Sequence, residues 1–395
     1  MATANEFKAE ADALRDELVA RRRDLHEHPE LGFEEVRTAG IVARELNNLG
    51  LEVQTGVGKT GVVGLLEGAH DGPTILVRAD MDALPIREEN ETDYASQTLG
   101  KMHACGHDGH TTIALGVAKL LSERKDQIAG RVKFVFQPAE EIGKGAQAMV
   151  DDGVLSDLRP DYSVGLHLWN SMPVGEIGIA DGAVMAGASI FKITIHGKGS
   201  HAASPHQGID PVVCAAQLVT AFQTIPSRNV DPLDTVVLSV TMIHTGDAFN
   251  VVPQSAEMRG TVRYYKREVV DLVKTRMQEM CDHIGAAMRC TVELDFQPMT
   301  IPVVNNPEVG AKLRQAFEPL IKPENMHLAE RTMGSEDVSL FMDDIPGTYF
   351  FLGAKDETRD AYYGHHHPRF SIDEDALPLG VALLSTAIAS YVLPE

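Results

Sequence analysis

The sequence is poor in cysteine, in tryptophan and in basic residues relative to acidic ones. Its 395 residues include four cysteines and one tryptophan, and 35 Lys and Arg stand against 57 Asp and Glu, for a formal net charge of −22. So few cysteines argue against a disulfide framework, and we expect reduced thiols in a cytoplasmic protein. The negative charge repels phosphate backbones, so nucleic acid is not an expected partner.

Long apolar runs are absent as well. No stretch of about 18 apolar residues occurs, which predicts that the chain does not span a membrane. The polar, charged segment 1–23 does not have the pattern of a secretory signal. What remains is the composition of a globular protein, with 44% hydrophobic and 23% charged residues. At roughly 100–200 residues per domain, the length predicts two or three domains.

The outer parts of the chain alternate between helical periodicity and short apolar runs. This alternation predicts an α/β domain with a mixed, largely parallel sheet flanked by helices. Helices are expected over 7–30, 38–49 and 111–123, and buried strands over 74–78, 132–136, 162–166 and 348–352.

The middle of the chain has a different pattern. Its elements follow the order β-α-β-β-α-β, which predicts an inserted ferredoxin-like α+β domain. The expected strands are 191–196, 235–244, 256–264 and 289–296, and the expected helices are 211–223 and 268–284. We therefore divide the chain into an outer domain, residues 1–186 and 300–395, and an inserted domain, residues 187–299.

Residues that can bind a metal follow the predicted buried strands. Because ligands bind beyond the carboxyl ends of the strands in open α/β sheets, these residues should meet at one edge of the sheet. Thiolate, imidazole and carboxylate are the ligands of zinc and similar divalent ions. The residues concerned are Asp80 and Asp82, Cys105 and His107, Glu140 and Glu141, His167, and the histidines of 365–367.

The pair Glu140-Glu141 has a chemical logic at such a site. One carboxylate can bind the metal while its neighbour accepts a proton from a water molecule, acting first as general base and then as acid. Adjacent glutamates more often form a solvated turn, and a histidine triplet can be an ordinary surface loop. The convergence of several such groups at one edge favours the functional interpretation.

Seven segments carry a resemblance to a known family. They are 24–33, 78–85, 102–110, 137–141, 165–167, 197–206 and 334–337. The most specific are Met-His-Ala-Cys-Gly-His-Asp at 102–108 and Gln-Pro-Ala-Glu-Glu at 137–141. Together they resemble the M20 metallopeptidases, in the amidohydrolase branch that includes hippurate hydrolase, N-acyl-L-amino acid amidohydrolases and auxin-conjugate hydrolases.

This resemblance implies a site with two divalent metal ions, for which Zn, Mn, Co and Ni are all suitable. Cys105 would bridge both ions, and Glu140 would be the general base. The remaining ligands would be His107 and Glu141 on one ion, and His167 and His366 on the other. Asp80 and Asp82 would orient ligands from behind.

The resemblance also assigns roles to the inserted domain, as a lid and a dimerisation domain. His201 would polarise the substrate carbonyl, while Asn250 and Arg263 would lie near the substrate carboxylate. The expected reaction is hydrolysis of the amide bond of an N-acyl amino acid by a homodimer or dimer-based oligomer.

Three alternatives remain at this stage. The protein could be a di- or carboxypeptidase of the same family, which needs the same metals. It could be a cysteine hydrolase in which Cys105 is the nucleophile and His107 the base. It could also be a metal-binding relative without turnover, which would have no use for Glu140.

Overall fold

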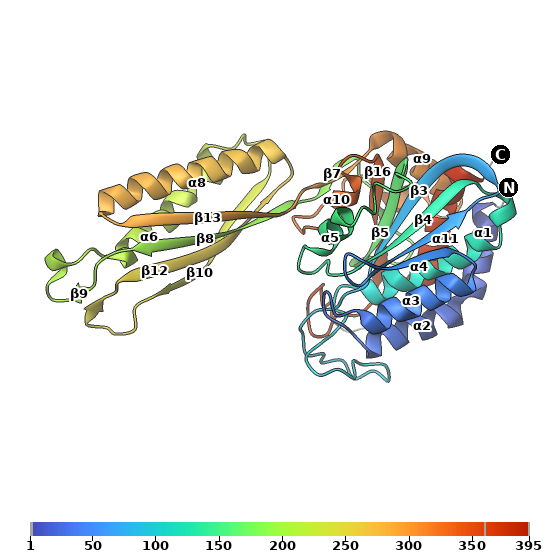
Figure 1. Cartoon of the computed structure of the whole chain (residues 1–395), viewed down its shortest axis with the longest axis horizontal. Coiled ribbons are helices and arrows are strands. Elements are labelled where there is room, and N and C mark those ends of the chain that lie inside the picture. The colour runs from blue at the N-terminus through green and yellow to red at the C-terminus, as the bar shows by residue number, and fades with distance from the viewer. Residues whose placement is uncertain (1–2, 359–360, 394–395) are drawn as a thin grey trace. The chain divides into compact units, whose positions relative to one another are not determined.

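The computed structural model describes residues 3–358 and 361–393 and divides them into two compact units (Figure 1). The first unit contains the described residues up to Val184, Val304–Arg331 and those from Asp337 on. The second contains Met185–Val303 and Thr332–Glu336. The short segment 332–336 thus groups with the insertion, because Thr332 accepts a hydrogen bond from the Tyr265 hydroxyl and Gly334 accepts one from the Ala186 N–H.

The first unit is built on a mixed sheet, whose described strands follow the order β1-β2-β4-β3-β5-β16-β6-β15. Its parallel centre consists of β4 (Ala129–Gln137), β3 (His70–Asp80), β5 (Tyr162–Pro173) and β16 (Gly347–Lys355). The flanking strands are β1 (Glu52–Val57), β2 (Gly61–Glu67), β6 (Ile177–Gly178) and β15 (Met326–His327). The predicted α/β class with a largely parallel sheet is confirmed.

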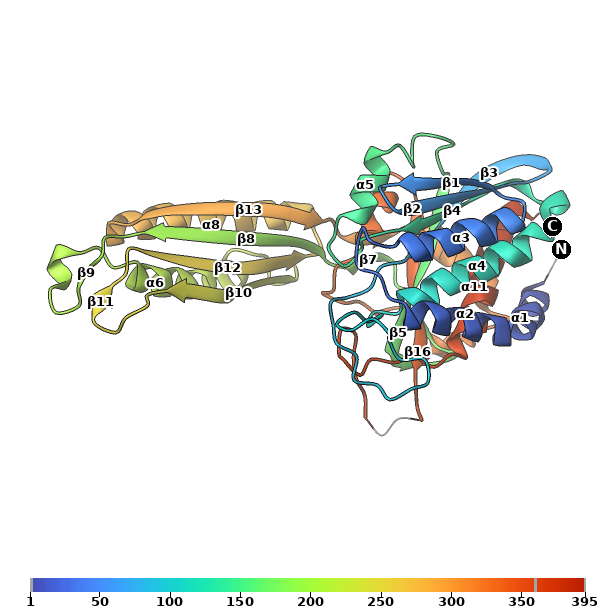
Figure 2. The ribbon, with the colours of Figure 1, turned by 60° about the horizontal axis from the view of Figure 1, so that its bottom comes forward.

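Helices cover both faces of this sheet (Figure 2). On one face lie α1 (Ala4–Ala13), α2 (Arg15–Glu27), α3 (Val36–Asn48), α4 (His107–Ser122), α9 (Pro307–Phe317) and α11 (Ala376–Val392). The other face carries α5 (Gly145–Asp151) and α10 (Ser339–Met342). The main core lies between α4, α11 and the sheet, where Gly116 permits a close approach, since a Cβ there would lie 2.7 Å from Val381 Cγ2.

The prediction of one helix over 7–30 is wrong. The helix is interrupted at Leu14, which ends α1 and precedes α2. The first helix packs on α11 and the second on α4. Both bury an apolar face against the same layer, so the periodicity of the sequence continues across the break.

The second unit has the ferredoxin-like order. Its described strands form an antiparallel sheet in the order β10-β12-β8-β13, with α6 and α8 packed together on it (Figure 1). The elements are β8 (Gly187–His196), α6 (Pro211–Phe222), β10 (Val236–Thr245), β12 (Ser255–Tyr264), α8 (Arg267–Met288) and β13 (Thr291–Thr300). Smaller elements are β9 (Ser200–His201), α7 (Thr224–Arg228) and β11 (Val251–Val252).

Where the chain passes between the units, β7 (Gly182–Met185) pairs with β14 (Val303–Asn305). Within the described ranges, the helices are all too short or too polar to cross a membrane.

Candidate metal centre

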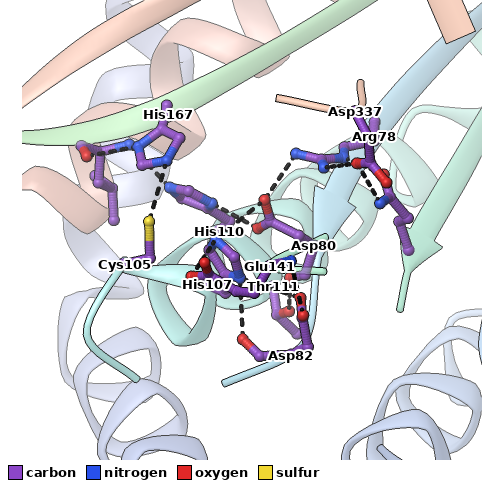
Figure 3. Close-up of polar contacts among 12 residues, drawn as sticks. Arg78, Asp80, Asp82, Cys105, His107, His110, Thr111, Glu141, His167 and Asp337 are labelled. Carbon is purple, nitrogen blue, oxygen red and sulfur yellow. Dashed lines mark hydrogen bonds and ion pairs between the residues drawn. The ribbon is translucent and has the colours of Figure 1, made fainter. Parts of the chain in front are cut away.

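The end of β3 places two aspartates at the edge of the central sheet. Asp80 is the last residue of the strand. Its Oδ2 accepts a hydrogen bond from Arg78 Nη1 at 2.7 Å, and its Oδ1 lies 2.6 Å from His110 Nδ1 (Figure 3). Burial opposes ionisation of Asp80, but Arg78 and the neighbouring histidines hold its pKa well below the usual range. The result is a fixed negative charge beneath the candidate ligands.

Cys105, in the loop before α4, and His107, the first residue of that helix, lie on either side of Gly106. That glycine has φ 93°, a left-handed conformation which lets the chain turn sharply into the helix. Cys105 Sγ lies 3.6 Å from His167 Nε2, which extends from β5 (Figure 3). His107 Nδ1 lies 2.9 Å from the carbonyl oxygen of Asp82, so its Nε2 is directed elsewhere.

Glu141 completes the cluster from the turn after β4. Its N–H donates to Asp82 Oδ2 at 3.0 Å, and its Oε1 lies 3.9 Å from His107 Nε2. Its second oxygen, Oε2, lies 3.4 Å from His366 Nε2. The peptide N–H of His366 donates to Ala104 O at 2.8 Å, which ties the histidine triplet to the loop before Cys105.

The three adjacent histidines have different environments. His365 Nε2 lies 3.0 Å from Leu168 O, and burial lowers the pKa of His365 to about 4. His367 Nδ1 accepts the N–H of Arg369 at 3.0 Å. Within the described part of the chain, only His366 of the three joins a group of potential metal ligands.

Two groups of potential ligands share Cys105. In each, the ligand atoms lie within 4.8 Å of one another: Cys105, His107 and His167 in the first, and Cys105, Glu141 and His366 in the second. The five predicted ligands are therefore neighbours, and the structure brings them together from four separate segments of the chain.

The donor set fits divalent metal ions. His107 Nε2 and Glu141 Oε1 are buried without a hydrogen-bond partner in the described structure, although buried polar atoms normally have one. Burial raises the pKa of the Cys105 thiol well above its usual value and raises that of Glu141 to about 7. A cation among these atoms would supply the missing partners and favour the ionised thiolate and carboxylate.

Glu140 lies at the border of the same cluster. It is partly exposed, and one of its carboxylate oxygens belongs to a group with the ligand atoms of His107 and Glu141, all within 4.8 Å. A carboxylate in this place can exchange protons with a water or a substrate next to the ligands.

The predicted substrate residues belong to the second unit. His201 is exposed on β9, and its Nδ1 accepts the N–H of Ala203 at 3.0 Å. The carbonyl oxygen of Asn250 accepts the N–H of Ala202 at 3.0 Å, so Asn250 neighbours the His201 loop. Arg263, on β12, donates to the hydroxyl of Ser335.

Sequence reasoning missed several residues that support the centre. Asp337 accepts hydrogen bonds from Gln137 Nε2 at 2.6 Å and from the Ala146 N–H at 3.0 Å, and it also lies beside Arg78. Asp108 forms a fully buried ion pair with Arg22 at 2.8 Å. A charged residue inside an apolar strand, such as Arg78, is the one signal that could have pointed to this network.

The α/β sheet with its cluster of thiol, imidazole and carboxylate groups defines a metal-dependent hydrolase. The comparison with protein families agrees: the model of peptidase family M20/M25/M40 matches residues 76–390. The chain belongs to this family, and the expected resemblance to its amidohydrolase branch is confirmed.

Relatives of known name match over almost the entire chain. Thermostable carboxypeptidase 1 of Saccharolobus solfataricus is 39% identical over 384 residues, which cover 96% of each chain. N-acetylcysteine deacetylase of Bacillus subtilis is 39% identical over 92% of this chain and 94% of its own. The solved structure of the Bacillus subtilis YXEP protein, described as a dinuclear metal binding peptidase of the M20 family, has a TM-score of 0.82 and 35% identity, covering 95% of this chain and 98% of its own.

Proposed function

We propose that the protein hydrolyses the amide bond of N-acyl amino acids, releasing a carboxylic acid and a free amino acid. The observation that carries this proposal is the pair of ligand groups sharing Cys105, with Glu140 beside them. The relative named for N-acetylcysteine deacetylation supports the substrate class, and the relative described as dinuclear supports two metal ions.

Five residues would hold the two ions. Cys105 would bridge them, with His107 and Glu141 on one and His167 and His366 on the other. The 3.9 Å between His107 Nε2 and Glu141 Oε1 leaves these two atoms able to share one ion. Zn, Mn, Co and Ni all accept such donors. When bound, divalent ions of this kind polarise a carbonyl group and lower the pKa of water.

The other predicted residues would transfer the proton and bind the substrate. Glu140 would accept a proton from the attacking water and pass it to the leaving amine nitrogen. The imidazole of His201 would donate a hydrogen bond to the carbonyl oxygen as it gains negative charge. Arg263 and Asn250 would bind the carboxylate of the amino acid.

We further propose that the second unit is the lid and dimerisation domain of a cytoplasmic homodimer, and that the first is the metal-binding catalytic domain. Closure of the lid would shield the reacting amide from bulk water. The crossings between the units near 184 and 303 would then act as hinges.

A substrate panel tests the proposed reaction. Protein loaded with one metal at a time is given N-acetyl, N-benzoyl and indole-acetyl amino acids and unblocked dipeptides, and amine release is measured. We expect a higher kcat/KM for at least one N-acyl class than for every dipeptide. Preference for dipeptides would favour the peptidase alternative, which the carboxypeptidase relative also supports. No release from any substrate with metal bound would favour a non-catalytic role.

A further inference from the structure

The turn before Glu140 has an unfavourable backbone conformation. Ala139 has φ 52°, in the left-handed region that alanine seldom adopts, and its side chain is fully buried. Residues 138–140 are Pro, Ala and Glu, so none of them is a glycine, the residue that adopts a left-handed conformation most readily. Such conformations persist where surrounding contacts over-determine them, and they are frequent at functional sites.

A carboxylate from a distant part of the chain holds this turn. Glu35, which precedes α3, is 0% exposed. Its Oε1 accepts the N–H of Ala139 at 2.8 Å, and its Oε2 accepts the hydroxyl of Thr60 at 2.6 Å. Both oxygens are therefore used, which is what a carboxylate needs when it is removed from water.

The loop before Glu35 also packs against the turn. A Cβ on Gly32 would lie 3.0 Å from Ala139 Cα, closer than side chains normally approach a backbone. Larger residues at position 32 would therefore displace residue 139. The loop at Gly32 therefore packs tightly against residue 139, whose N–H is the one that Glu35 binds.

A second carboxylate fixes the other side of Glu140. The N–H of Glu141 donates to Asp82 Oδ2 at 3.0 Å. The peptide N–H groups before and after Glu140 are thus each bound by a carboxylate from another segment, Glu35 on one side and Asp82 on the other. Two such constraints determine the direction in which Glu140 leaves the backbone.

We propose that Glu35 is a positioning residue for the reaction: by binding the Ala139 N–H it keeps residue 139 left-handed and so directs Glu140 toward the substrate. This inference rests on the proposed role of Glu140 as the base. Glu35 does not belong to any group of potential metal ligands among the described residues. Its loss should therefore lower the rate of the reaction more than it lowers the amount of bound metal.

The test measures kcat, KM and metal content for Glu35→Ala and for Glu35→Met, which keeps much of the side-chain volume should the alanine variant fold poorly. We expect kcat to fall by about 10- to 100-fold, as for a small displacement of a reacting group, with KM within about threefold and full metal content. Glu35→Gln should recover most of the loss, because its amide oxygen can accept the Ala139 N–H and its amide nitrogen can donate to Thr60. The matched control is Glu34→Gln, the exposed neighbouring glutamate.

A second change separates positioning from general stability. Glycine adopts the left-handed conformation without cost, so adding Ala139→Gly to Glu35→Ala should restore part of kcat. A merely structural role predicts no such rescue. Unchanged kcat in both Glu35→Ala and Glu35→Met, or a loss explained entirely by missing metal, would overturn the inference. Glu140→Gln is assayed beside them, and if it stays active the proposed base is wrong whatever Glu35 does.

Discussion

At the residue scale, the centre combines Cys105, Glu141 and His107, whose pKa values the fold raises for different reasons. Burial raises the pKa of Cys105 and Glu141, whereas Asp80, Asp82 and Cys105 outweigh burial at His107 and raise its pKa well above the usual value. Without metal, the cluster therefore holds protons that metal binding must displace.

Proton release on metal binding should depend on pH. The pKa of Glu141 is raised to about 7, so this carboxyl is mostly protonated at pH 6 and mostly ionised at pH 8. We expect more protons released per metal, and weaker apparent affinity, at pH 6 than at pH 8. Calorimetry in two buffers with different ionisation enthalpies measures this number. In Glu141→Gln, the number of protons released per metal should differ much less between pH 6 and pH 8. Equal proton release from the wild type at both pH values would contradict the raised pKa of Glu141.

The base assignment makes a second prediction at this scale. Replacing Glu140 by glutamine keeps the size of the side chain but removes its ability to accept a proton. We expect kcat to fall by about 10²- to 10⁴-fold, the range typical of lost general acid–base catalysis. Metal content measured on the same samples should stay at the wild-type level. Near-normal turnover with metal bound would show that another group takes the proton.

At the scale of helices and strands, the sequence predicted the elements better than their junctions. The buried strands were found because apolar runs such as 132–136 end at polar residues, and those ends also located Glu140, Glu141 and His167. Leu14, which interrupts the first helix, has the spacing of a continuous helix, because α1 and α2 bury the same face. Glu35 and Asp337 could not be found, since their roles depend on contacts with residues more than 100 positions away in the chain.

One buried ion pair connects α2 to the start of α4. Arg22 Nε lies 2.8 Å from Asp108 Oδ2, which also lies 2.7 Å from His26 Nδ1, and these side chains are almost fully buried. Burial opposes the charge of Asp108, but Arg22 and His26 hold its pKa far below the usual range. Removing one partner of such a pair leaves an uncompensated charge.

Asp108→Asn should therefore destabilise the protein by about 3–5 kcal/mol at pH 7, measured by urea unfolding. A depressed pKa contributes stability that is present above the unfolded-state value, roughly 4, and is lost as pH falls toward the folded value. The difference in the free energy of unfolding between Asp108→Asn and the wild type should thus be smaller at pH 3 than at pH 7. Asp12→Asn, which removes an exposed pair with Lys8, should change stability by less than about 1 kcal/mol. A difference in unfolding free energy that does not change with pH would contradict this role for Asp108.

At the scale of the molecule, the proposed roles fall on different units. The five residues proposed to bind the metal ions belong to the first unit, whereas the residues proposed to bind the substrate belong to the second. Sequence reasoning placed the crossings near 186 and 300 because the periodicity changes there. It did not anticipate that 332–336 groups with the insertion, since Thr332 and Gly334 are bound by hydrogen bonds from Tyr265 and Ala186 that no local pattern reveals.

The central claim is that hydrolysis of an N-acyl amino acid depends on metal held by the Cys105 cluster. The most direct test strips the protein with a chelator, restores zero, one or two equivalents of a single metal, and measures metal content and amine release on the same samples. We predict release below detection without metal, maximal release at two equivalents, and no restoration in Cys105→Ala. Turnover that survives complete metal removal would contradict the claim and favour Cys105 acting as a nucleophile.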